Sequence, residues 1–218
     1  MARPATGPAP TRLSREVLVD ACVRIADQQG PDAVTLRRLG SELGVDPTAV
    51  YRHFRDKAEL LVAMADRLLV EALNGFEPTG SWRADLRALT LRARRAYLAH
   101  PRLAHVLASS EAPLPSESRI SELGLGLLRE AGLPDAEAAL AFQAIEGYTA
   151  GTSSIDAVTG PGDGEAWRRA FAALPAREYP NLSRTAPLMY RDDDAAFEFG
   201  LDLMLEAIEA RAGAADRP

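Results

Sequence analysis

The sequence predicts an all-α protein, and three observations support this fold class. Apolar residues recur about every 3.6 residues, which places them on one face of a helix; the run from Val17 to Ala26 is an example. Capping residues and Gly or Pro stops bracket these segments, and the connections between them are short. No stretch shows the alternation of apolar and polar residues that is typical of a half-buried strand. Helices connected in this way pack against one another around a shared core.

Four helices are predicted in the N-terminal part, after an arm at residues 1–13 that is rich in Pro, Ala and Thr and expected to be disordered. They cover residues 14–29 and 35–43, a short segment from residue 46, and 56–73. Each begins at a residue whose side chain can accept a hydrogen bond from a free backbone amide: Ser14, Thr35, Asp46 and Asp56. Glu59, three residues after Asp56, completes the pattern of a capping box.

The C-terminal part is predicted to contain longer helices, which bury a larger core. The predicted helices are 81–99, 102–109, 116–132, 135–158, 167–174 and 192–211. Residues 111–115 are expected to form a turn, and residues 159–165 and 175–191 to form loops. Residues 213–218 are expected to be a disordered tail.

Composition and charge argue against a membrane protein and a secreted protein. Hydrophobic residues make up 47% of the 218 residues, yet no apolar run approaches the ~20 residues that span a bilayer. The first residues lack the apolar core of a secretory signal, so a cytoplasmic protein without a membrane role is expected. The net charge is −6, but residues 1–60 carry nine basic and eight acidic residues. The acidity therefore lies in the rest of the chain.

The segment TLRRLGSELGVDPTAVYRHFRDK, residues 35–57, is typical of a helix-turn-helix. Leucines at positions 36, 39 and 43 give the first helix an apolar face, and Val50 and Phe54 do the same for the second. Gly40 permits a close approach of the second helix. Gly44 can adopt the left-handed conformation that the turn needs.

With these faces buried, a different set of side chains on the second helix of the motif should face solvent. Short polar, methyl-bearing and aromatic groups of this kind suit contacts in a DNA major groove. Lys57 follows at the start of the next helix, where it and the free amides can reach a phosphate. The expected exposed residues are Pro47, Thr48, Ala49, Tyr51, Arg52 and His53.

Over Ser14–Leu61 the chain resembles the DNA-binding domain of the tetracycline-repressor (TetR) family, through T-L-R-R-L-G-x-x-L-G-V, T-A-V-Y-R-H-F and D-K-A-E-L-L. The resemblance implies an all-helical homodimer, usually a repressor that a small ligand releases from a pseudo-palindromic operator in double-stranded DNA. It also implies phosphate contacts for Tyr51 and Lys57. The positions that fall where family members contact DNA are Arg37, Thr48, Ala49, Tyr51, His53 and Lys57.

The segment WRADLRALTLRARRAYLAHPRLAHVLAS, in which Trp82 opens a helix and His100-Pro101 closes it, resembles the regulatory half of the branch nearest the tetracycline repressors. This resemblance implies a DNA-binding domain at 14–60 and a ligand-binding and dimerisation domain at 61–212. It also implies a dimer interface in which the helices near 135–158 and 193–210 make a four-helix bundle.

Several residues are candidates for a ligand pocket, although ordinary core packing or the dimer interface is an equally good interpretation for many of them. An effector held among apolar helices is expected to be hydrophobic or amphipathic. Glu146 and Gln143 lie on an otherwise apolar helix, where a polar group needs a partner in the ligand or in the dimer mate. The candidates are Trp82, His100, His105, Phe142, Glu146, Tyr148, Trp167 and Phe171.

Other motifs are interpreted structurally. His100 and His105, with Glu111, have poor spacing for a metal, and helix capping or pocket lining is preferred. Asp192, Asp193 and Asp194 fit a helix N-terminus, and GPGDGE lacks the features of a phosphate loop. Cys22 lies on an apolar helix face and fits an inert core position better than a redox sensor. No catalytic set, metal or cofactor is predicted, so a helical enzyme or carrier, or an adaptor with a degenerate helix-turn-helix, ranks below a DNA-binding regulator.

Overall fold

The fold was obtained as a computed structural model that describes residues 13–103, 114–159 and 163–215. Helices are the only regular elements in these ranges, as the all-α prediction requires. None of the described helices is long and apolar enough to cross a membrane. The elements are α1 (Arg15–Gln29), η1 (Pro31–Ala33), α2 (Leu36–Leu43), η2 (Pro47–Arg52), α3 (Lys57–Leu73), α4 (Trp82–Ala99), α6 (Pro115–Glu130), α7 (Asp135–Thr159), α8 (Asp163–Ala172), α9 (Pro180–Thr185), η3 (Ala186–Leu188) and α10 (Asp193–Ala215), where η denotes a 3-10 helix.

Local capping explains where the first helices begin and end. The Ser14 side chain accepts a hydrogen bond from the Val17 amide, and Thr35 accepts one from the Arg38 amide. Gly44 ends α2 with a φ of 65°, a left-handed conformation that suits glycine. The predicted close approach of the second helix to Gly40 is confirmed, because a Cβ there would lie 3.1 Å from Cγ of Pro47, the first residue of η2, and 2.8 Å from the carbonyl oxygen of Val45 in the turn.

Two clusters of buried side chains form the core. The first joins α1, α2, η2 and α3 around residues such as Leu18, Leu39 and Met64. The second joins α4, α6, α7 and α10 around residues such as Leu128 and Leu201. Because α3 packs against α1 at one end and against α4 and α6 along its length, it physically connects the N-terminal helices to the rest of the molecule.

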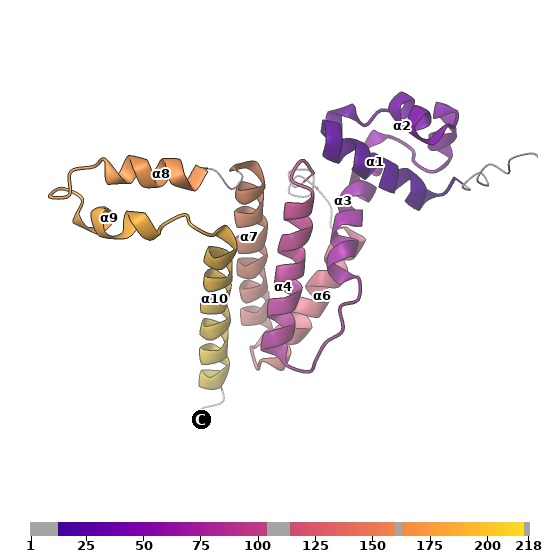
Figure 1. Ribbon diagram of the computed structural model, residues 1–218. Helices are drawn as coiled ribbons and strands as arrows, with labels where there is room; N and C mark the ends of the chain where they lie inside the picture. Colours follow the sequence, from indigo (N-terminus) through magenta and orange to yellow (C-terminus); the bar gives the residue numbers. More distant parts are fainter. Residues whose placement is uncertain (1–12, 104–113, 160–162, 216–218) are drawn as a thin grey trace, which may run out of the picture.

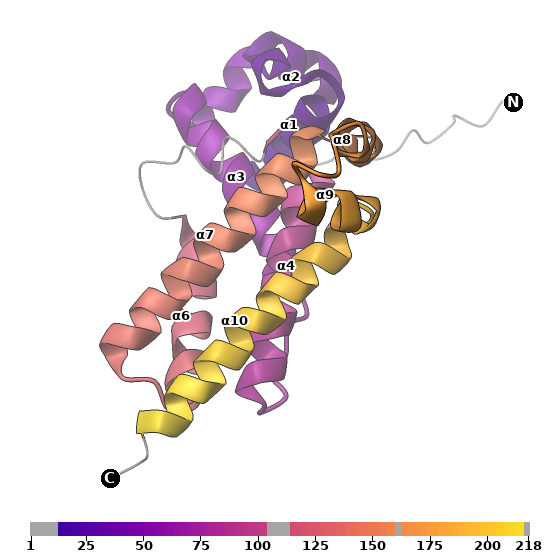
Figure 2. The ribbon, with the colours of Figure 1, turned by 90° about the vertical axis from the view of Figure 1, so that its left-hand side faces the viewer.

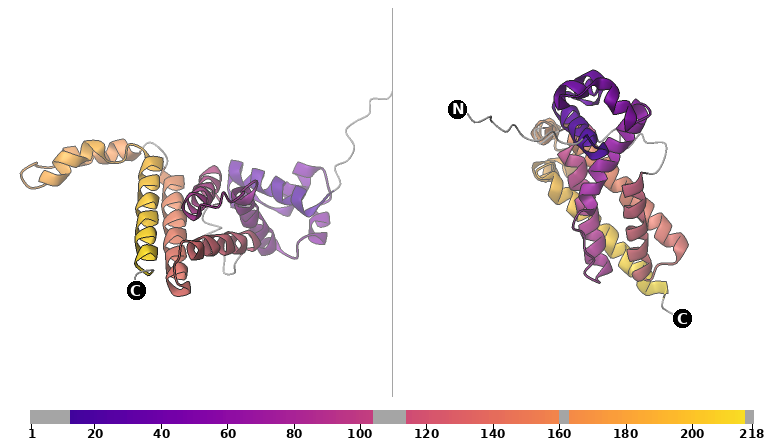
Figure 3. Two further views of the ribbon diagram at one scale, coloured as in Figure 1. Left: turned by 90° about the horizontal axis from the view of Figure 1, so that it is seen from below. Right: turned by 90° about the vertical axis from the view of Figure 1, so that its right-hand side faces the viewer.

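The arrangement of the helices leaves α7 and α10 on the outside of the molecule. In the view of Figure 2, α7 and α10 lie nearest the viewer, in front of α4 and α6. Seen from below in Figure 3, α4 and α6 lie between α7 and the N-terminal helices. Helices α8 and α9 project from the top of α7 and α10 as a separate arm (Figure 1). Within that arm the rings of Trp167, Phe171 and Tyr190 form one aromatic group.

Several predicted boundaries are wrong, and proline explains most of them. Residues 175–191 were expected to be a loop, but they contain α9 and η3; Pro180 and Pro187 occupy first-turn positions, where the missing amide removes no helical hydrogen bond. For the same reason α6 begins at Pro115, inside the expected turn. Helix α8 begins at Asp163, in the expected 159–165 loop, and α10 continues through Ala215, into the expected tail, where alanines favour helix.

Other expectations fall outside the described residues. These are the arm at 1–12, most of the helix predicted at 102–109, the end of the tail at 216–218, and His105 and Glu111. Of the remaining interpretations, Asp192 caps α10, since its carboxylate accepts a hydrogen bond from the Ala195 amide at 2.9 Å. Cys22 is completely buried, and this burial raises the pKa of its thiol to about 12.

Candidate DNA-binding surface and ligand cavity

The second helix of the predicted helix-turn-helix is a 3-10 helix of six residues, η2, and not an α-helix. The Ala49 amide donates to the Asp46 carbonyl and the His53 amide to the Val50 carbonyl, both at 2.9 Å, which is the spacing of a 3-10 turn. The Asp46 side chain caps this helix. Its carboxylate accepts hydrogen bonds from the Thr48 amide at 2.7 Å and from the Thr48 hydroxyl at 2.6 Å.

These bonds have two consequences for the surface. The Thr48 hydroxyl, followed by the Thr48 amide, holds the pKa of the Asp46 carboxyl below its usual value. The same bond uses the hydroxyl hydrogen of Thr48 within the protein. The Thr48 side chain therefore presents its methyl group and an acceptor oxygen to a ligand, rather than a donor.

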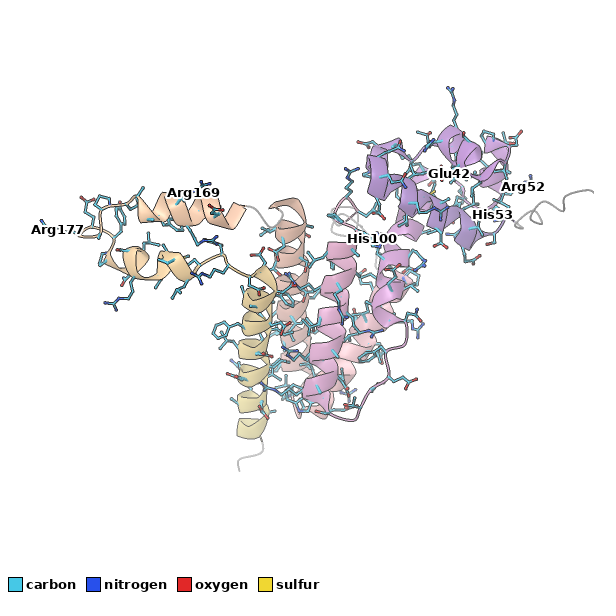
Figure 4. All side chains as sticks on the ribbon, in the orientation of Figure 1. Glu42, Arg52, His53, His100, Arg169 and Arg177 are labelled. Atoms are coloured by element: carbon cyan, nitrogen blue, oxygen red, sulfur yellow. The ribbon has the colours of Figure 1, made fainter. Side chains whose placement is uncertain are left out.

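Most of the predicted DNA contacts lie on the outer surface of the N-terminal helices. Figure 4 shows Arg52 and His53 at the outer edge, away from α4. Tyr51 is 57% exposed. Exposed positions on this part of the molecule are Arg37, Pro47, Thr48, Tyr51, Arg52 and Lys57, and His53 is partly buried.

The expectation that Ala49 is exposed is wrong, since only 5% of it is accessible. Ala49 follows the exposed Thr48 but sits beside Val50, which is fully buried. A single methyl group at the edge of a buried face is short enough for its neighbours to cover it. The Ala49 side chain therefore presents almost no surface to DNA.

Arg15, on α1, is a positioning residue that the sequence analysis missed. Its Nη1 atom donates to the His53 carbonyl at 2.8 Å and to Glu59 Oε1 at 3.0 Å, and its Cζ atom lies 4.3 Å from the centre of the Phe54 ring. Arg15 therefore connects the end of η2 to the start of α3. No local motif indicates this contact, because its partners lie 38 and 44 residues away.

Glu59 also differs from its predicted role. Asp56 caps α3 as expected, by accepting from the Glu59 amide at 2.8 Å. The Glu59 carboxylate, however, accepts from the Arg55 amide at 2.9 Å and from the Arg15 side chain, instead of returning to the Asp56 amide as in a capping box. The Arg55 amide and the Arg15 guanidinium hold the pKa of Glu59 at about 2. Glu59 is therefore an anion that fixes two arginines beside η2.

A cavity lies between α3, α4, α6 and α7. Its volume is about 70 Å³, or about 580 Å³ when the region open to solvent is included. The lining is mainly apolar, with a few hydroxyls and two carboxylates. The lining residues are Leu69, Leu86, Leu89, Thr90, Ala93, Tyr97, Glu117, Ile120, Ser121, Phe142, Ile145, Glu146, Thr149 and Ala150.

Of the candidate pocket residues, Phe142 and Glu146 line this cavity, and the other described candidates do not. Trp82 packs against the second core cluster, and Tyr148 stacks on Phe197 of α10 with ring centres 5.0 Å apart. Trp167 and Phe171 belong to the α8 arm. Aromatic side chains on an amphipathic helix serve equally well in core packing, which is why the residue types alone did not separate them.

His100 was expected to cap a helix or to line the pocket, and it does the first. It is the C-cap of α4, and Figure 4 shows it at the end of α4 that faces the N-terminal helices. Its Nδ1 atom lies 2.9 Å from Asp27 Oδ2 on α1, and its Nε2 atom lies 3.6 Å from Glu71 Oε2 on α3. His100 thus connects α4, which lines the cavity, to α1 and α3.

Two sequence-family models match the chain. Residues 18–64 match the bacterial regulatory proteins of the tetR family, and residues 74–212 match the tetracyclin repressor-like C-terminal domain.

Individual proteins agree with these matches. The HTH-type transcriptional repressor DrrR1 of Streptomyces coeruleorubidus is 33% identical over 95% of this chain and 81% of its own length. The Streptomyces coelicolor TetR family protein ActR in complex with actinorhodin is 29% identical, with a TM-score of 0.77 over 93% of this chain and 100% of that chain. BioQ with its double-stranded DNA operator is 26% identical, with a TM-score of 0.65 over 91% of this chain and 99% of that chain.

Proposed function

The chain belongs to the TetR family, and from this premise we propose that it binds operator DNA as a homodimer and releases it when a small molecule occupies the cavity between α3, α4, α6 and α7. It is a TetR-family transcriptional repressor and not an enzyme. Its place of action in this proposal is the cytoplasm, where it meets the operator.

The exposed surface of η2 is the observation on which the DNA-binding proposal mainly rests. Tyr51 and Arg52 project from a short helix whose other face is anchored by the buried Val50. Lys57 is exposed at the first position of α3, so a phosphate near it would also meet free amides at the N-terminus of a long helix. We infer that η2 enters the major groove while Tyr51 and Lys57 contact phosphates.

The dimer is proposed on α7 and α10. Leu140 on α7 and Phe199 and Leu203 on α10 are at least half exposed, although all three are large apolar side chains. A groove of about 300 Å³ between the two helices adds further apolar surface, including Met204 and Ile208. Apolar surface of this extent on an outer face favours association. A two-fold dimer would place its recognition helices about 34–36 Å apart, or a multiple of this distance, so the operator should be a pseudo-palindrome.

The proposed release mechanism uses the contacts that link the cavity walls to the N-terminal helices. Asp66 of α3 accepts a hydrogen bond from the Ser116 amide, at the start of α6, at 2.7 Å. At the C-terminal end of α4, His100 contacts Asp27 of α1. A ligand that fits the cavity better when α4 or α6 is displaced would shift the population toward dimers whose recognition helices are misplaced.

Selection of genomic DNA fragments with the purified protein would provide the operator for the test. Tyr51→Ala and Lys57→Ala should then weaken binding to every sequence, and Lys57→Ala should reduce the slope of log affinity against log salt by about 1. Fluorescence anisotropy at several salt concentrations measures both effects. Arg177→Ala, on the distant α8–α9 arm, removes one exposed positive charge and is the matched control. Unchanged affinity in the first two variants would refute the assignment of the recognition surface.

The dimer interface has its own test. Leu203→Glu buries a charge if α10 lies at the interface, so the variant should be monomeric in sedimentation velocity and should lose most of its operator affinity. Val70→Glu places the same charge on an exposed apolar position of α3 and should leave the oligomeric state unchanged. A Leu203→Glu protein with the mass of the parent assembly would overturn the proposed interface.

A further inference from the structure

Two carboxylates are the only acidic side chains among the described residues of the cavity lining. Glu117 comes from α6 and Glu146 from α7, and both lie on the wall of the same cavity. Burial, and then the charge of Glu117, raise the pKa of Glu146. Burial also raises the pKa of the Tyr97 hydroxyl, with further contributions from Glu117 and Glu146. The two carboxylates and the phenol are therefore close enough to act on one another across the cavity.

These three groups have hydrogen-bonding capacity that the described part of the chain does not use. Glu146 and the Tyr97 hydroxyl have no hydrogen-bond or ion-pair partner there. Glu117 accepts one hydrogen bond, from the Leu114 amide to Oε2 at 3.0 Å, and its other oxygen is available.

The remaining polar groups of the lining are already satisfied. The hydroxyls of Thr90, Ser121 and Thr149 each donate to a carbonyl of their own helix at 2.7–2.9 Å. The polar contacts that a ligand would make therefore fall mainly on the two carboxylates and Tyr97.

Among the residues that the structure describes, no positive side chain pairs with either carboxylate. The described part of the lining contains no Arg, Lys or His. The arginines beside the lining residues on α4 have other contacts. Arg92 donates to the Ala72 and Asn74 carbonyls at the end of α3, Arg94 pairs with Asp156 of α7 and Asp194 of α10, and Arg95 donates to the Leu91 carbonyl. Glu146 is exposed and Glu117 is half-buried, so both carboxylates are accessible to a ligand that enters from solvent. Because the apolar lining lowers the local dielectric constant, a cation beside them is attracted more strongly than it would be in bulk water.

We propose that the ligand of this cavity is an amphipathic organic cation, whose apolar body packs against Leu86, Leu89 and Phe142 and whose charged group lies between Glu117 and Glu146. This inference rests on the proposed function only in taking the cavity as the effector site. The aromatic rings of Tyr97 and Phe142 would add cation–π attraction to the contacts with the carboxylates.

An organic cation suits this site better than a metal ion. Metal sites in proteins are built from several ligating side chains, and no group of three or more His, Cys, Asp or Glu is suitably placed among the described residues. The wide apolar lining would have no role around a hydrated ion, whereas it matches the body of an amphipathic molecule.

The test compares two probes of the same shape, phenyltrimethylammonium and its uncharged carbon analogue tert-butylbenzene. Both are titrated by ligand-observed NMR against the full-length protein and against the variant Glu117→Gln/Glu146→Gln. Glutamine keeps the size of each side chain, and its amide oxygen can still accept from the Leu114 amide. We expect the double variant to bind the cation about tenfold more weakly, because it removes two charge contacts in a partly buried site. Its affinity for the hydrocarbon should change by less than about threefold.

Glu122→Gln is the matched control, since Glu122 is exposed on α6 and does not line the cavity. Equal changes for both probes, no change for the cation, or no binding of the cation to the parent protein below about 10 mM would each overturn the proposal. Cation binding that disappears when EDTA is added would overturn it in favour of a metal. Operator binding is measured in a separate experiment without either probe. A protein that fails to bind any operator would refute the proposed function, but the preference of the cavity for the cation over the hydrocarbon could still be measured.

Discussion

Arg15 on α1 donates a hydrogen bond to Glu59 on α3 at 3.0 Å, and the same guanidinium nitrogen donates to the carbonyl of His53, just after η2. One side chain therefore fixes three segments of the helix-turn-helix unit relative to one another. The orientation of η2 depends on this ion pair as well as on the buried apolar face.

The first prediction is that the contribution of Glu59 to stability depends on pH. Its pKa is about 2 in the folded protein and near 4.5 in an unfolded chain, so its ionised form stabilises the fold above about pH 4.5 and this contribution is lost as the pH falls toward 2. Glu59→Gln should lower the urea midpoint at neutral pH. The difference from the parent protein should shrink progressively below about pH 4.5.

Glu42→Gln provides the comparison for Glu59. Glu42 pairs with Arg38 at 3.5 Å on an exposed face of α2, where such a pair contributes little. Its substitution should change the urea midpoint only slightly at any pH. A Glu59→Gln deficit of the same size at neutral and acidic pH would show that the charge of Glu59 is not what stabilises the unit.

The second prediction concerns the contact between His100 and Asp27. Asp27 is partly buried; its Oδ2 atom contacts His100, and its Oδ1 atom has no hydrogen-bond partner among the described residues. His100→Ala should lower the free energy of unfolding by about 1–3 kcal/mol, because it leaves the Asp27 carboxylate unpaired. A double-mutant cycle with Asp27→Ala should give a coupling energy of about 1 kcal/mol. The cycle with Glu71→Ala, whose oxygen is 3.6 Å from the ring, should give less; equal values would contradict the assigned pairing.

Much of the fold follows from local signals, which is why the sequence predicts it well. Caps such as Ser14 and Asp56, and stops such as Gly44, act within a few residues of the helix ends that they set. The spacing of apolar residues likewise identifies the buried faces. Where a proline can either end a helix or begin one, as at Pro180, the local sequence permits both outcomes, and the prediction failed.

The candidate sites were harder to predict, because they depend on contacts between distant residues. His100 meets Asp27 across 73 positions of sequence, and no periodicity indicates that pairing. Glu146 could be selected because a carboxylate on an apolar helix needs a partner. Its companion Glu117 belongs to another helix and carries no local signal, so the pair emerges only from the packing of α6 against α7.

The third prediction concerns Arg94, which is 3% exposed in its side chain. It lies 2.8 Å from Asp156 on α7 and 2.9 Å from Asp194 at the start of α10, and it covers the Phe197 ring at 4.4 Å. Arg94→Ala should cost about 3–5 kcal/mol of unfolding free energy, since it leaves Asp156 with an unpaired charge in a mostly buried site.

Two further variants separate charge from packing at this position. Arg94→Met refills the volume and should cost less than Arg94→Ala, because it keeps contact with Phe197. Asp194→Asn should cost under about 1 kcal/mol, since the Asp194 side chain is 73% exposed. Urea unfolding followed by circular dichroism measures all three. Similar losses for Asp194→Asn and Arg94→Ala would mean that the exposed pair, and not the buried one, dominates.

The fourth prediction compares two glycines on α6 that lie one half-turn apart. A Cβ added at Gly124 would lie 2.6 Å from the Phe142 ring, whereas one added at Gly126 would have nothing within 4 Å. Alanine is favoured over glycine in a helix by about 1 kcal/mol, so Gly126→Ala should raise the unfolding free energy by up to that amount. At Gly124 the same gain is opposed by overpacking, which costs about 1–3 kcal/mol, so Gly124→Ala should be neutral or destabilising. Because Phe142 lines the cavity, its ring can relieve the clash only by moving, and this movement should also change the affinity of the cavity for phenyltrimethylammonium. If urea unfolding shows equal stabilisation by both alanines, with unchanged probe affinity, α6 and α7 do not approach each other closely at Gly124 in solution.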